Sequence, residues 1–439
     1  MKSALPKVIH PIAGRPMLEH VIRTSKELGA EKIHVVVGHQ ADRVQSIIND
    51  EAVHWVMQKE QLGTGHAVAQ VLPELPDHAR VLVLYGDVPL TRPDTLKNLV
   101  GQLDDHALAL LTVNMDDPNG YGRIVRDATG KVTAIVEHKD ASAEQKSIRE
   151  VNTGILATGA AALKTRLPKL SDGNAQGEYY LTDIVGMAAD AGERIAVSQP
   201  QTVFEVQGVN NRVQLAELER WFQKHQAEQL MLAGATLADP SRVDIRGQVV
   251  VGEDVFIDVN VVFEGDVILG DNVSVGPGCV IKDAKIAAGT DVKAYSVIES
   301  SSIGENAQIG PFARFRPGNE LAANTKVGNF VEIKKSIVGE GSKISHLSYV
   351  GDASLGRNVN VGAGTITCNY DGVNKFKTEI GDGVFVGSNT SLVAPVHIAT
   401  DATIGAGSTI TRDVADHELA VARGRQRNVS GWERPKKSD

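Results

Sequence analysis

The sequence predicts an α/β domain, a connecting helix and then a parallel β-helix built from six-residue repeats. Three observations predict this order. In the second half of the chain, aliphatic residues recur every six positions, and glycine often follows them. In the first half, short apolar runs alternate with helical patterns. Between the two halves lies one long amphipathic stretch. A fixed six-residue period indicates a solenoid, whereas a helix repeats near 3.6 residues and a strand every second residue.

The six-residue repeat begins at Val251 and runs nearly to the end of the chain. Six residues suffice for one short strand and a corner, with the aliphatic side chain inward and a small residue at the turn. Three such sides close a coil of about eighteen residues, stacked at the ~4.8 Å spacing of paired strands. The repeat positions are Val251, Ile257, Phe263, Leu269, Val275, Ile281, Ile286, Val292, Ile298, Ile303, Ile309, Phe315, Leu321, Val327, Ile333, Val338, Ile344, Val350, Leu355, Val361, Thr367, Ile380, Val386, Leu392, Ile398, Ile404 and Ile410.

Repeats of this kind resemble the left-handed parallel β-helix, an exception to the right-handed crossover rule. Each coil contacts only its neighbours, so the two ends need caps. Residues 234–247 and the polar tail after Arg412 are the candidate caps. The one long break in the series, from Cys368 to Glu379, predicts a loop that projects from a corner.

The first 211 residues predict a Rossmann-like α/β domain. Alternating strands and helices favour a parallel sheet with ligands at the strand ends. A single amphipathic helix over 211–232 then connects the two domains, which gives boundaries at 1–211, 212–233 and 234–439. The expected strands are Lys32–Val37, Arg80–Tyr85 and Ala107–Val113, and the expected helices are Pro16–Leu28, Gly65–Leu72 and Pro93–Leu103.

Composition excludes several classes of function. The 439 residues carry a formal net charge of −9, which argues against a nucleic-acid partner. A membrane span would need about 18 consecutive apolar residues, and the sequence has no such run. The start lacks the apolar region of a signal peptide, and two cysteines suit a reducing compartment. We therefore expect a cytoplasmic protein.

Motifs in the first half resemble those of sugar-nucleotide pyrophosphorylases. Leu5-Pro6-Lys7 and Pro11-Ile12-Ala13-Gly14-Arg15-Pro16-Met17 match an early segment, and the run from Gln58 to Ala67 matches a loop that reads uracil and phosphate. Tyr85-Gly86-Asp87 lies at the end of an expected strand, where a carboxylate can hold Mg²⁺ against phosphate oxygens. The remaining motifs are Gly120-Tyr121-Gly122-Arg123, Glu137, Asn152-Thr153-Gly154 and Asn210.

Together with the hexad repeat, these motifs resemble the bacterial family of bifunctional N-acetylglucosamine-1-phosphate uridyltransferases / glucosamine-1-phosphate N-acetyltransferases, from Leu5 to about Pro435. The resemblance implies that the second domain acetylates glucosamine 1-phosphate with acetyl-CoA. The first domain then joins N-acetylglucosamine 1-phosphate to UTP with Mg²⁺ and releases pyrophosphate. The product, UDP-N-acetylglucosamine, feeds peptidoglycan and, in Gram-negative bacteria, lipopolysaccharide.

The resemblance also implies which residues form the uridyltransferase site. Lys7 would contact the triphosphate, and Asp87 and Asn210 would hold the metal. The uridine would contact Gln58, Gly63 and Thr64, the sugar phosphate Tyr85, Gly86 and Asp87, and the sugar Gly122, Glu137 and Asn152.

Acetyl transfer to an amine needs a base, and histidine titrates near neutral pH. The repeat region contains His346, His397 and His417, and His346 aligns with the catalytic base of the family. The resemblance implies that Arg316 and Lys334 bind the sugar phosphate, that Tyr349 and Asn360 position the sugar, and that Lys375 on the projecting loop contributes near a subunit boundary. The implied acetyl-CoA contacts are Ala363, Asn369, Tyr370, Ser388, Ala406 and Arg423.

The resemblance implies a homotrimer with acyl-donor sites between subunits. A covalent alternative would use Cys368 as an acyl-accepting nucleophile, since thiolates accept acyl groups. That route predicts that Cys368→Ser abolishes transfer, whereas direct transfer predicts a mild effect.

The family begins with a strand and a glycine-rich loop, and this sequence begins where that loop would end. Backbone N–H groups of such loops cradle phosphates. We expect a bifunctional enzyme whose start is placed too late in this sequence, so that the native product carries both activities. The alternative is that the chain as written is an acetyltransferase only, because the missing loop weakens or disables uridylyl transfer.

Three other functions are possible, and the sequence argues against the first two of them. A solenoid can be a non-catalytic scaffold. A β-helix metalloenzyme of the carbonic-anhydrase type would need three histidines on one zinc ion. A third possibility is a sugar nucleotidyltransferase with a regulatory β-helix.

Overall fold

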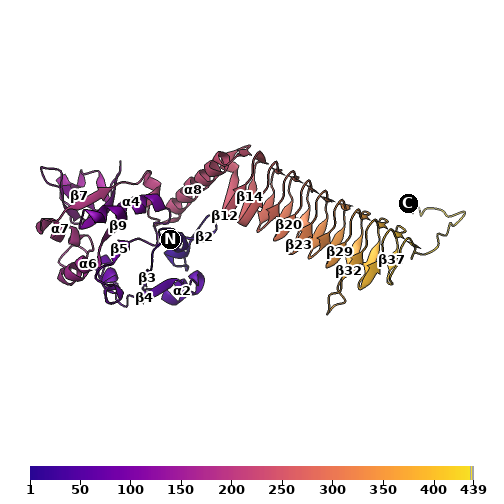
Figure 1. The fold of residues 1–439 in the computed structure, drawn as a ribbon, viewed down its shortest axis with the longest axis horizontal. Coiled ribbons are helices and arrows are strands. Elements are labelled where there is room, and N and C mark those ends of the chain that lie inside the picture. Colours follow the sequence, from indigo (N-terminus) through magenta and orange to yellow (C-terminus); the bar gives the residue numbers. More distant parts are fainter. Residues whose placement is uncertain (436, 438–439) are drawn as a thin grey trace. The chain divides into compact units, whose positions relative to one another are not determined.

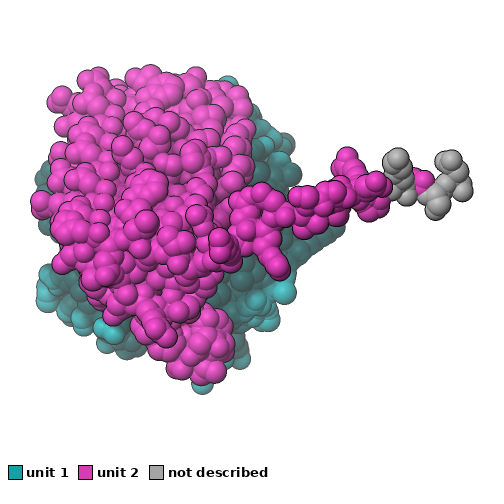
Figure 2. Space-filling view, turned by 90° about the vertical axis from the view of Figure 1, so that its right-hand side faces the viewer, with its two compact units in different colours: residues 1–222 teal, residues 223–439 magenta. Residues whose placement is uncertain are grey.

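The computed structural model describes residues 1–435 and 437, so the last positions of the expected 234–439 domain lie outside it. The chain divides into two compact units, Met1–Phe222 and Gln223–Asp439, which Figure 2 colours separately. The long helix α8 (Arg212–Leu232) contains the division between them. None of the described helices is both long and apolar enough to cross a membrane.

The first unit contains a mixed sheet, not the parallel sheet that we expected. Its order is β10-β6-β9-β7-β8, with β5 also paired to β9. Only β10 and β6 pair in parallel here, because β9 runs antiparallel to β5, β6 and β7. An apolar run predicts that a strand forms but not the direction in which it runs, which explains why the parallel sheet was predicted wrongly. The strands are β5 (Arg80–Val83), β6 (Leu108–Asn114), β7 (Arg123–Arg126), β8 (Val132–Val136), β9 (Glu150–Gly159) and β10 (Ile195–Ser198).

Helices cover both faces of this sheet. Successive residues of a strand point to opposite faces, so alternate residues of β6 join different cores. Ala109 and Leu111 belong to the cluster that contains Leu96 of α4 (Pro93–Gly101). Leu108 and Leu110 pack with residues of α6 (Ala160–Arg166) and α7 (Asp183–Asp190). Burial on both faces explains why the first four residues of β6, Leu108 to Leu111, are all apolar.

A smaller layer holds the chain start. β3 (Ile33–Val37) and β4 (Val53–Met57) pair in parallel, and α1 (Met17–Glu27) and α2 (Ala41–Ile48) pack on them. The expected strands and helices therefore form, with somewhat different ends. The other elements of the unit are η1 (Lys7–Ile9), β1 (Pro11–Ile12), β2 (Arg15–Pro16), α3 (Thr64–Ala69), η2 (Leu72–Glu74), η3 (Gln102–Asp104), α5 (Ala143–Lys146), η4 (Leu167–Lys169) and η5 (Val203–Val206).

The second unit is a parallel coil whose strands stack turn upon turn from β12 to β37 (Figure 1). Each strand pairs with the strand one coil further on, as Val243 does with Val261 and Val297 with Arg314. The predicted repeat positions are confirmed as inward: they are buried, apart from the partly buried Val251. Predicting the side-chain direction was possible because each coil is nearly the same length.

One ladder of the coil carries the His346 strand. Its strands are β11 (Ala235–Leu237), β13 (Val255–Ile257), β15 (Ser274–Val275), β18 (Asp291–Val292), β21 (Gln308–Ile309), β24 (Lys326–Asn329), β27 (Lys343–His346), β30 (Asn360–Val361), β33 (Phe385–Val386), β36 (Thr403–Ile404) and β38 (Leu419–Ala420).

The other ladder covers two sides of the coil, because β14 pairs with both β16 and β17. Its strands are β12 (Val243–Val251), β14 (Val261–Leu269), β16 (Val280–Lys282), β17 (Lys285–Ile286), β19 (Val297–Glu299), β20 (Ser301–Ile303), β22 (Arg314–Phe315), β23 (Asn319–Leu321), β25 (Glu332–Lys334), β26 (Ile337–Val338), β28 (Tyr349–Gly351), β29 (Ala353–Leu355), β31 (Ile366–Cys368), β32 (Thr378–Ile380), β34 (Ser391–Val393), β35 (Val396–Ile398) and β37 (Thr409–Ile410).

The first coil is covered by the end of α8. Ala227 and Leu230 belong to the core of the coil, and the Gln223 side chain exchanges hydrogen bonds with the backbone N–H and C=O of Ile245. A helix end therefore serves as a cap, in addition to η6 (Pro240–Arg242) and β11, which lie in the expected capping segment. The described part of the tail after Arg412 adds Val414 and β38 at the other end.

Candidate active sites

Three residues expected at the uridyltransferase site meet beside the end of β5. The Lys7 ammonium lies 2.5 Å from Asp87 Oδ2 and 3.1 Å from Asn210 Oδ1. The backbone also joins them, since the Val209 N–H donates to the Asp87 carbonyl at 3.1 Å. Residues far apart in sequence are thus brought together where a phosphate-binding cation and metal-binding oxygens were expected.

Tyr85 lies at the centre of the same site. Burial raises the pKa of Tyr85 to about 12, with further contributions from Glu137 and Asp87. A hydrogen bond with Thr64 acts in the opposite direction. Gly154 has a φ of +86°, and a Cβ there would collide with the Tyr85 ring. Glycine at 154 therefore leaves room for the Tyr85 ring.

Glu137 is placed by Thr182, a residue that the motifs did not indicate. The Thr182 hydroxyl donates to Glu137 Oε1 at 3.1 Å. Burial raises the pKa of Glu137, and this hydrogen bond partly offsets the rise. A Cβ at Gly122 would lie 3.3 Å from the Glu137 carboxylate, and the Asn152 N–H donates to the Gly122 carbonyl at 2.8 Å. The three expected sugar ligands are therefore neighbours.

The expected uridine loop is closed by residues around Tyr179. Gly63 has a φ of +109°, and a Cβ there would lie 2.7 Å from the Tyr179 carbonyl oxygen. Gln58 Nε2 donates to the Gly63 carbonyl at 3.3 Å and contacts His66 Nδ1 at 3.0 Å. Thr64 Oγ1 accepts from the Leu181 N–H at 3.1 Å. These bonds hold Gln58, Gly63 and Thr64 together, and Thr64 also hydrogen-bonds with Tyr85.

Magnesium would fit the oxygens of Asp87 and Asn210. Mg²⁺ takes oxygen ligands and commonly uses only one or two protein side chains, with water and substrate phosphates completing the shell. The two side chains already converge on one cation, the Lys7 ammonium. Among the residues that the structure describes, no group of three or more His, Cys, Asp or Glu side chains could hold a metal on its own.

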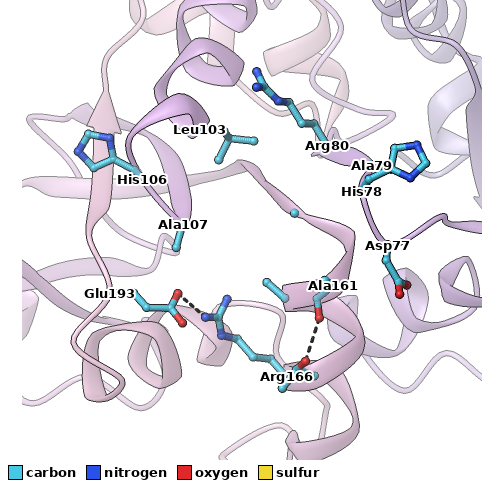
Figure 3. Close-up of a pocket in the computed structure, with 13 residues that line it drawn as sticks. Asp77, His78, Ala79, Arg80, Leu103, His106, Ala107, Ala161, Arg166 and Glu193 are labelled. Atoms are coloured by element: carbon cyan, nitrogen blue, oxygen red, sulfur yellow. Dashed lines mark hydrogen bonds and ion pairs between the residues drawn. The ribbon is translucent and has the colours of Figure 1, made fainter.

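A separate hollow in the first unit lies away from these residues. It is lined by Arg80, His106, Arg166 and Glu193, among others, and by none of the expected site residues (Figure 3). The charges in it are already paired, Arg166 with Glu193 and Arg80 with Asp104. It is therefore a poor candidate for a substrate site.

In the second unit, four expected residues form one column. The buried residues Ile344, Val361, Val386 and Ile404 pair successively along the ladder. Two positions after each of them stand His346, Ala363, Ser388 and Ala406, respectively. The Asn389 N–H donates to the Ala363 carbonyl and the Gly407 N–H to the Ser388 carbonyl, each at 2.8 Å.

Arg423 extends this column. Its guanidinium donates to the Ala406 carbonyl at 2.5 Å. We name the set His346, Ala363, Ser388, Ala406 and Arg423 the acyl column. Small residues leave a track along the coil for an extended chain, and an arginine at its end can pair with a phosphate. This arrangement suits an acyl carrier with a charged end, and it places His346 at the other end.

The residues expected to bind the sugar phosphate lie beyond the corner at Leu347, on the adjacent side of the coil. Arg316 contacts Glu332 at 3.3 Å, and Lys334 lies 3.5 Å from the carboxylate of Asp352. The projecting loop brings Lys375 to Lys334, and this contact lowers the pKa of Lys375. Such clustered cations are suited to a phosphate.

Asp352 fastens both ends of the projecting loop. It accepts a hydrogen bond from Asn369 Nδ2 at 2.5 Å, and its carbonyl accepts from the Thr378 N–H at 3.2 Å. Asn369 is thus buried and hydrogen-bonded to Asp352, whereas Tyr370 is exposed and its hydroxyl donates to Gly372 O at 2.5 Å.

The two residues expected to position the sugar lie on different strands of the coil, β28 and β30. Tyr349 lies against Gly351, where a Cβ would collide with the Tyr349 hydroxyl. Asn360 pairs with Lys343 on the His346 strand.

The other histidines of the coil have separate partners. His397 Nδ1 lies 3.6 Å from Glu379, and His417 Nδ1 lies 3.8 Å from Asp401. His346 Nδ1 instead contacts Asn329 Oδ1 at 2.7 Å. Neither Asn329 nor Asp352 stands out in the sequence as a site residue. The signal that could have found Asn329 is its position one coil before His346.

Comparison with known proteins identifies the family. Bifunctional protein GlmU of Marinobacter nauticus is 70% identical over 438 residues, which are 100% of this chain and 96% of that protein. Bifunctional protein GlmU of Stutzerimonas stutzeri is 57% identical, again over 100% and 96%, and that of Cellvibrio japonicus is 58% identical over 99% and 96%. The chain belongs to the GlmU family.

Models of smaller domains match parts of this GlmU chain. Residues 1–150 match the MobA-like NTP transferase domain, 245–319 the GMPPB C-terminal domain, and 377–412 the bacterial transferase hexapeptide (six repeats). A solved UDP-glucose pyrophosphorylase complexed with UDP-glucose covers 50% of the chain and 91% of its own, at 16% identity and a TM-score of 0.42. The bifunctional relatives align over the whole chain, and nothing in that comparison shows a loss of uridylyl transfer.

Proposed function

We propose that this chain makes UDP-N-acetylglucosamine in two steps, acetyl transfer from acetyl-CoA to glucosamine 1-phosphate and then uridylyl transfer from UTP. The observation that carries the proposal is 70% identity over the whole chain to a bifunctional protein GlmU. The acyl column and the cluster around Asp87 support one site in each unit.

In the acetyl-transfer step, the amine of glucosamine 1-phosphate attacks the thioester carbonyl of acetyl-CoA. His346 takes the amine proton as the C–N bond forms, and the C–S bond then breaks to release the CoA thiolate. Arg316, Lys334 and Lys375 bind the sugar phosphate, and Tyr349 and Asn360 position the sugar. Ala363, Asn369, Tyr370, Ser388, Ala406 and Arg423 are the proposed acetyl-CoA contacts.

In the uridylyl-transfer step, a phosphate oxygen of N-acetylglucosamine 1-phosphate attacks the α-phosphorus of UTP, and pyrophosphate leaves. Lys7 lies where it can neutralise phosphate charge, and Gly122, Glu137 and Asn152 hold the sugar. Gln58, Gly63 and Thr64 bind the uridine, while Tyr85, Gly86 and Asp87 border the sugar phosphate. A Mg²⁺ ion held by Asp87 and Asn210 would stabilise charge on the phosphates.

We further propose that the chain is a homotrimer. Exposed apolar side chains on one corner of successive coils support it. Tyr295, Phe312 and Phe330 stack at ring distances of 5.3 Å and are 57%, 46% and 57% exposed, and Leu347 follows on the next coil. Together these four form the aromatic corner. It adjoins His346, so a second subunit packed there would lie beside the acyl column.

The proposed substrates also support a place in the cytoplasm, where UTP and acetyl-CoA are made. Two assays on the purified chain test the function: transfer from acetyl-CoA to glucosamine 1-phosphate, and pyrophosphate release from UTP and N-acetylglucosamine 1-phosphate with Mg²⁺. We expect both signals. Acetyl transfer without pyrophosphate release would leave only the acetyltransferase half of the proposal standing.

A further inference from the structure

We propose that Asn329 is a positioning residue for acetyl transfer, which fixes His346 in the tautomer whose Nε2 can accept the substrate proton. The inference rests on the proposed acetyl transfer at His346. Asn329 would not touch the reacting atoms. It would act by fixing the orientation and tautomer of the His346 ring.

The hydrogen bond between the two side chains defines the tautomer. Asn329 Oδ1 lies 2.7 Å from His346 Nδ1. An amide oxygen only accepts hydrogen bonds, so Nδ1 must carry the hydrogen of this bond. In the neutral imidazole, Nε2 then keeps its lone pair. A base needs such a lone pair directed at the amine.

The backbone holds Asn329 and His346 in register. They are paired residues of β24 and β27, and the Leu347 N–H donates to the Asn329 carbonyl at 3.1 Å. Gly328 lets the coils approach, because a Cβ there would collide with the carbonyl of Ser345. Ser348 Oγ donates to the His346 carbonyl at 2.8 Å. The contact is therefore built by the coil and does not depend on a flexible loop.

An amide suits this position better than a carboxylate. A neighbouring carboxylate would favour the imidazolium and raise the pKa of the base. An imidazolium cannot take the amine proton. An amide orients the ring without adding a negative charge beside it. The next residue of the acyl column, Ala363, is uncharged as well.

The test compares Asn329→Ala and Asn329→Asp in the full chain. We expect Asn329→Ala to lower kcat for acetyl transfer by about 10- to 100-fold, by analogy with residues that orient metal-binding histidines. The KM values should change little. Pyrophosphate release, measured on the same samples, should be unchanged and reports on folding of the rest of the chain.

Asn329→Asp separates positioning from a purely structural role. The bond to Nδ1 is kept, but the carboxylate should raise the pKa of His346, so the acidic limb of the kcat/KM profile should move to higher pH. An unmoved limb in Asn329→Asp, or full kcat in Asn329→Ala, would overturn the inference. Failure of the proposed function itself would give a different result. Either the wild-type chain would not transfer acetyl groups, or His346→Ala would remain active.

Discussion

Glu137 illustrates how burial sets the chemistry of a single residue. Its carboxylate is the proposed sugar ligand. An ionised carboxylate accepts hydrogen bonds from sugar hydroxyls through both oxygens, whereas a protonated one loses an acceptor site and becomes a donor at one oxygen. Burial raises the pKa of Glu137, and the Thr182 hydroxyl counteracts that rise. Thr182 therefore keeps Glu137 ionised toward lower pH.

We predict that Thr182→Val raises the pKa of Glu137 further, because the variant removes a donor to the charged form. The sugar-binding carboxylate would then be protonated at higher pH. The acidic limb of kcat/KM for N-acetylglucosamine 1-phosphate should move upward in pH. Thr182→Ser keeps the hydroxyl and is the matched control. Identical profiles for the Val and Ser variants would show that the hydrogen bond does not tune Glu137.

The sequence motifs indicated candidate site residues, but they did not indicate the residues that support those candidates. Lys7, Asp87 and Asn210 were expected at one site, and they do contact one another. Thr182, Asn329 and Asp352 were missed, because each acts through a partner that only the fold brings near. A side chain that supports a functional residue has no motif of its own.

Among the elements, the coil strands show most clearly what a sequence pattern can and cannot predict. The six-residue period predicted the inward residues correctly, because one rule of geometry applies to every coil. The sheet of the first unit was predicted parallel and is mixed. Strand direction there depends on β9 pairing with β5, β6 and β7, which local patterns do not encode.

Gly362 tests how tightly neighbouring coils must pack. A Cβ at this position would lie 2.6 Å from the Ser388 backbone nitrogen, closer than atoms can approach. We predict that Gly362→Ala destabilises the coil by about 1–3 kcal/mol, as overpacked sites do. It should also weaken acetyl-CoA binding, because Ser388 belongs to the acyl column.

Thermal unfolding and the KM for acetyl-CoA measure the two effects. Gly424→Ala is the matched control, since no neighbouring heavy atom lies within 4 Å of a Cβ at Gly424. An unchanged unfolding temperature in Gly362→Ala would mean that the coils can separate at no cost. In that case, close packing would not position the acyl column.

At the scale of the whole molecule, the aromatic corner can be used to test whether three chains assemble. Three stacked rings exposed on one corner are costly in water and stabilising when covered. We predict that the double variant Phe312→Glu, Phe330→Glu sediments as a monomer and loses most acetyl transfer. Pyrophosphate release should persist, because its proposed site lies in the other unit.

Val429→Glu is a control that adds charge at an exposed apolar residue elsewhere. It should leave the sedimentation unchanged. A trimeric double variant would show that the aromatic corner is not the contact between subunits. A wild-type monomer with full acetyl transfer would contradict the trimer itself.

We propose that one chain carries two separate active sites joined by a diffusible product. Formation of UDP-N-acetylglucosamine from glucosamine 1-phosphate, acetyl-CoA and UTP tests it most directly, in wild type, His346→Ala, Asp87→Ala and a mixture of the two variants. We predict product from wild type, little from either variant alone, and recovery in the mixture, because N-acetylglucosamine 1-phosphate passes between them. A mixture that stays inactive beside active wild type would contradict two independent sites.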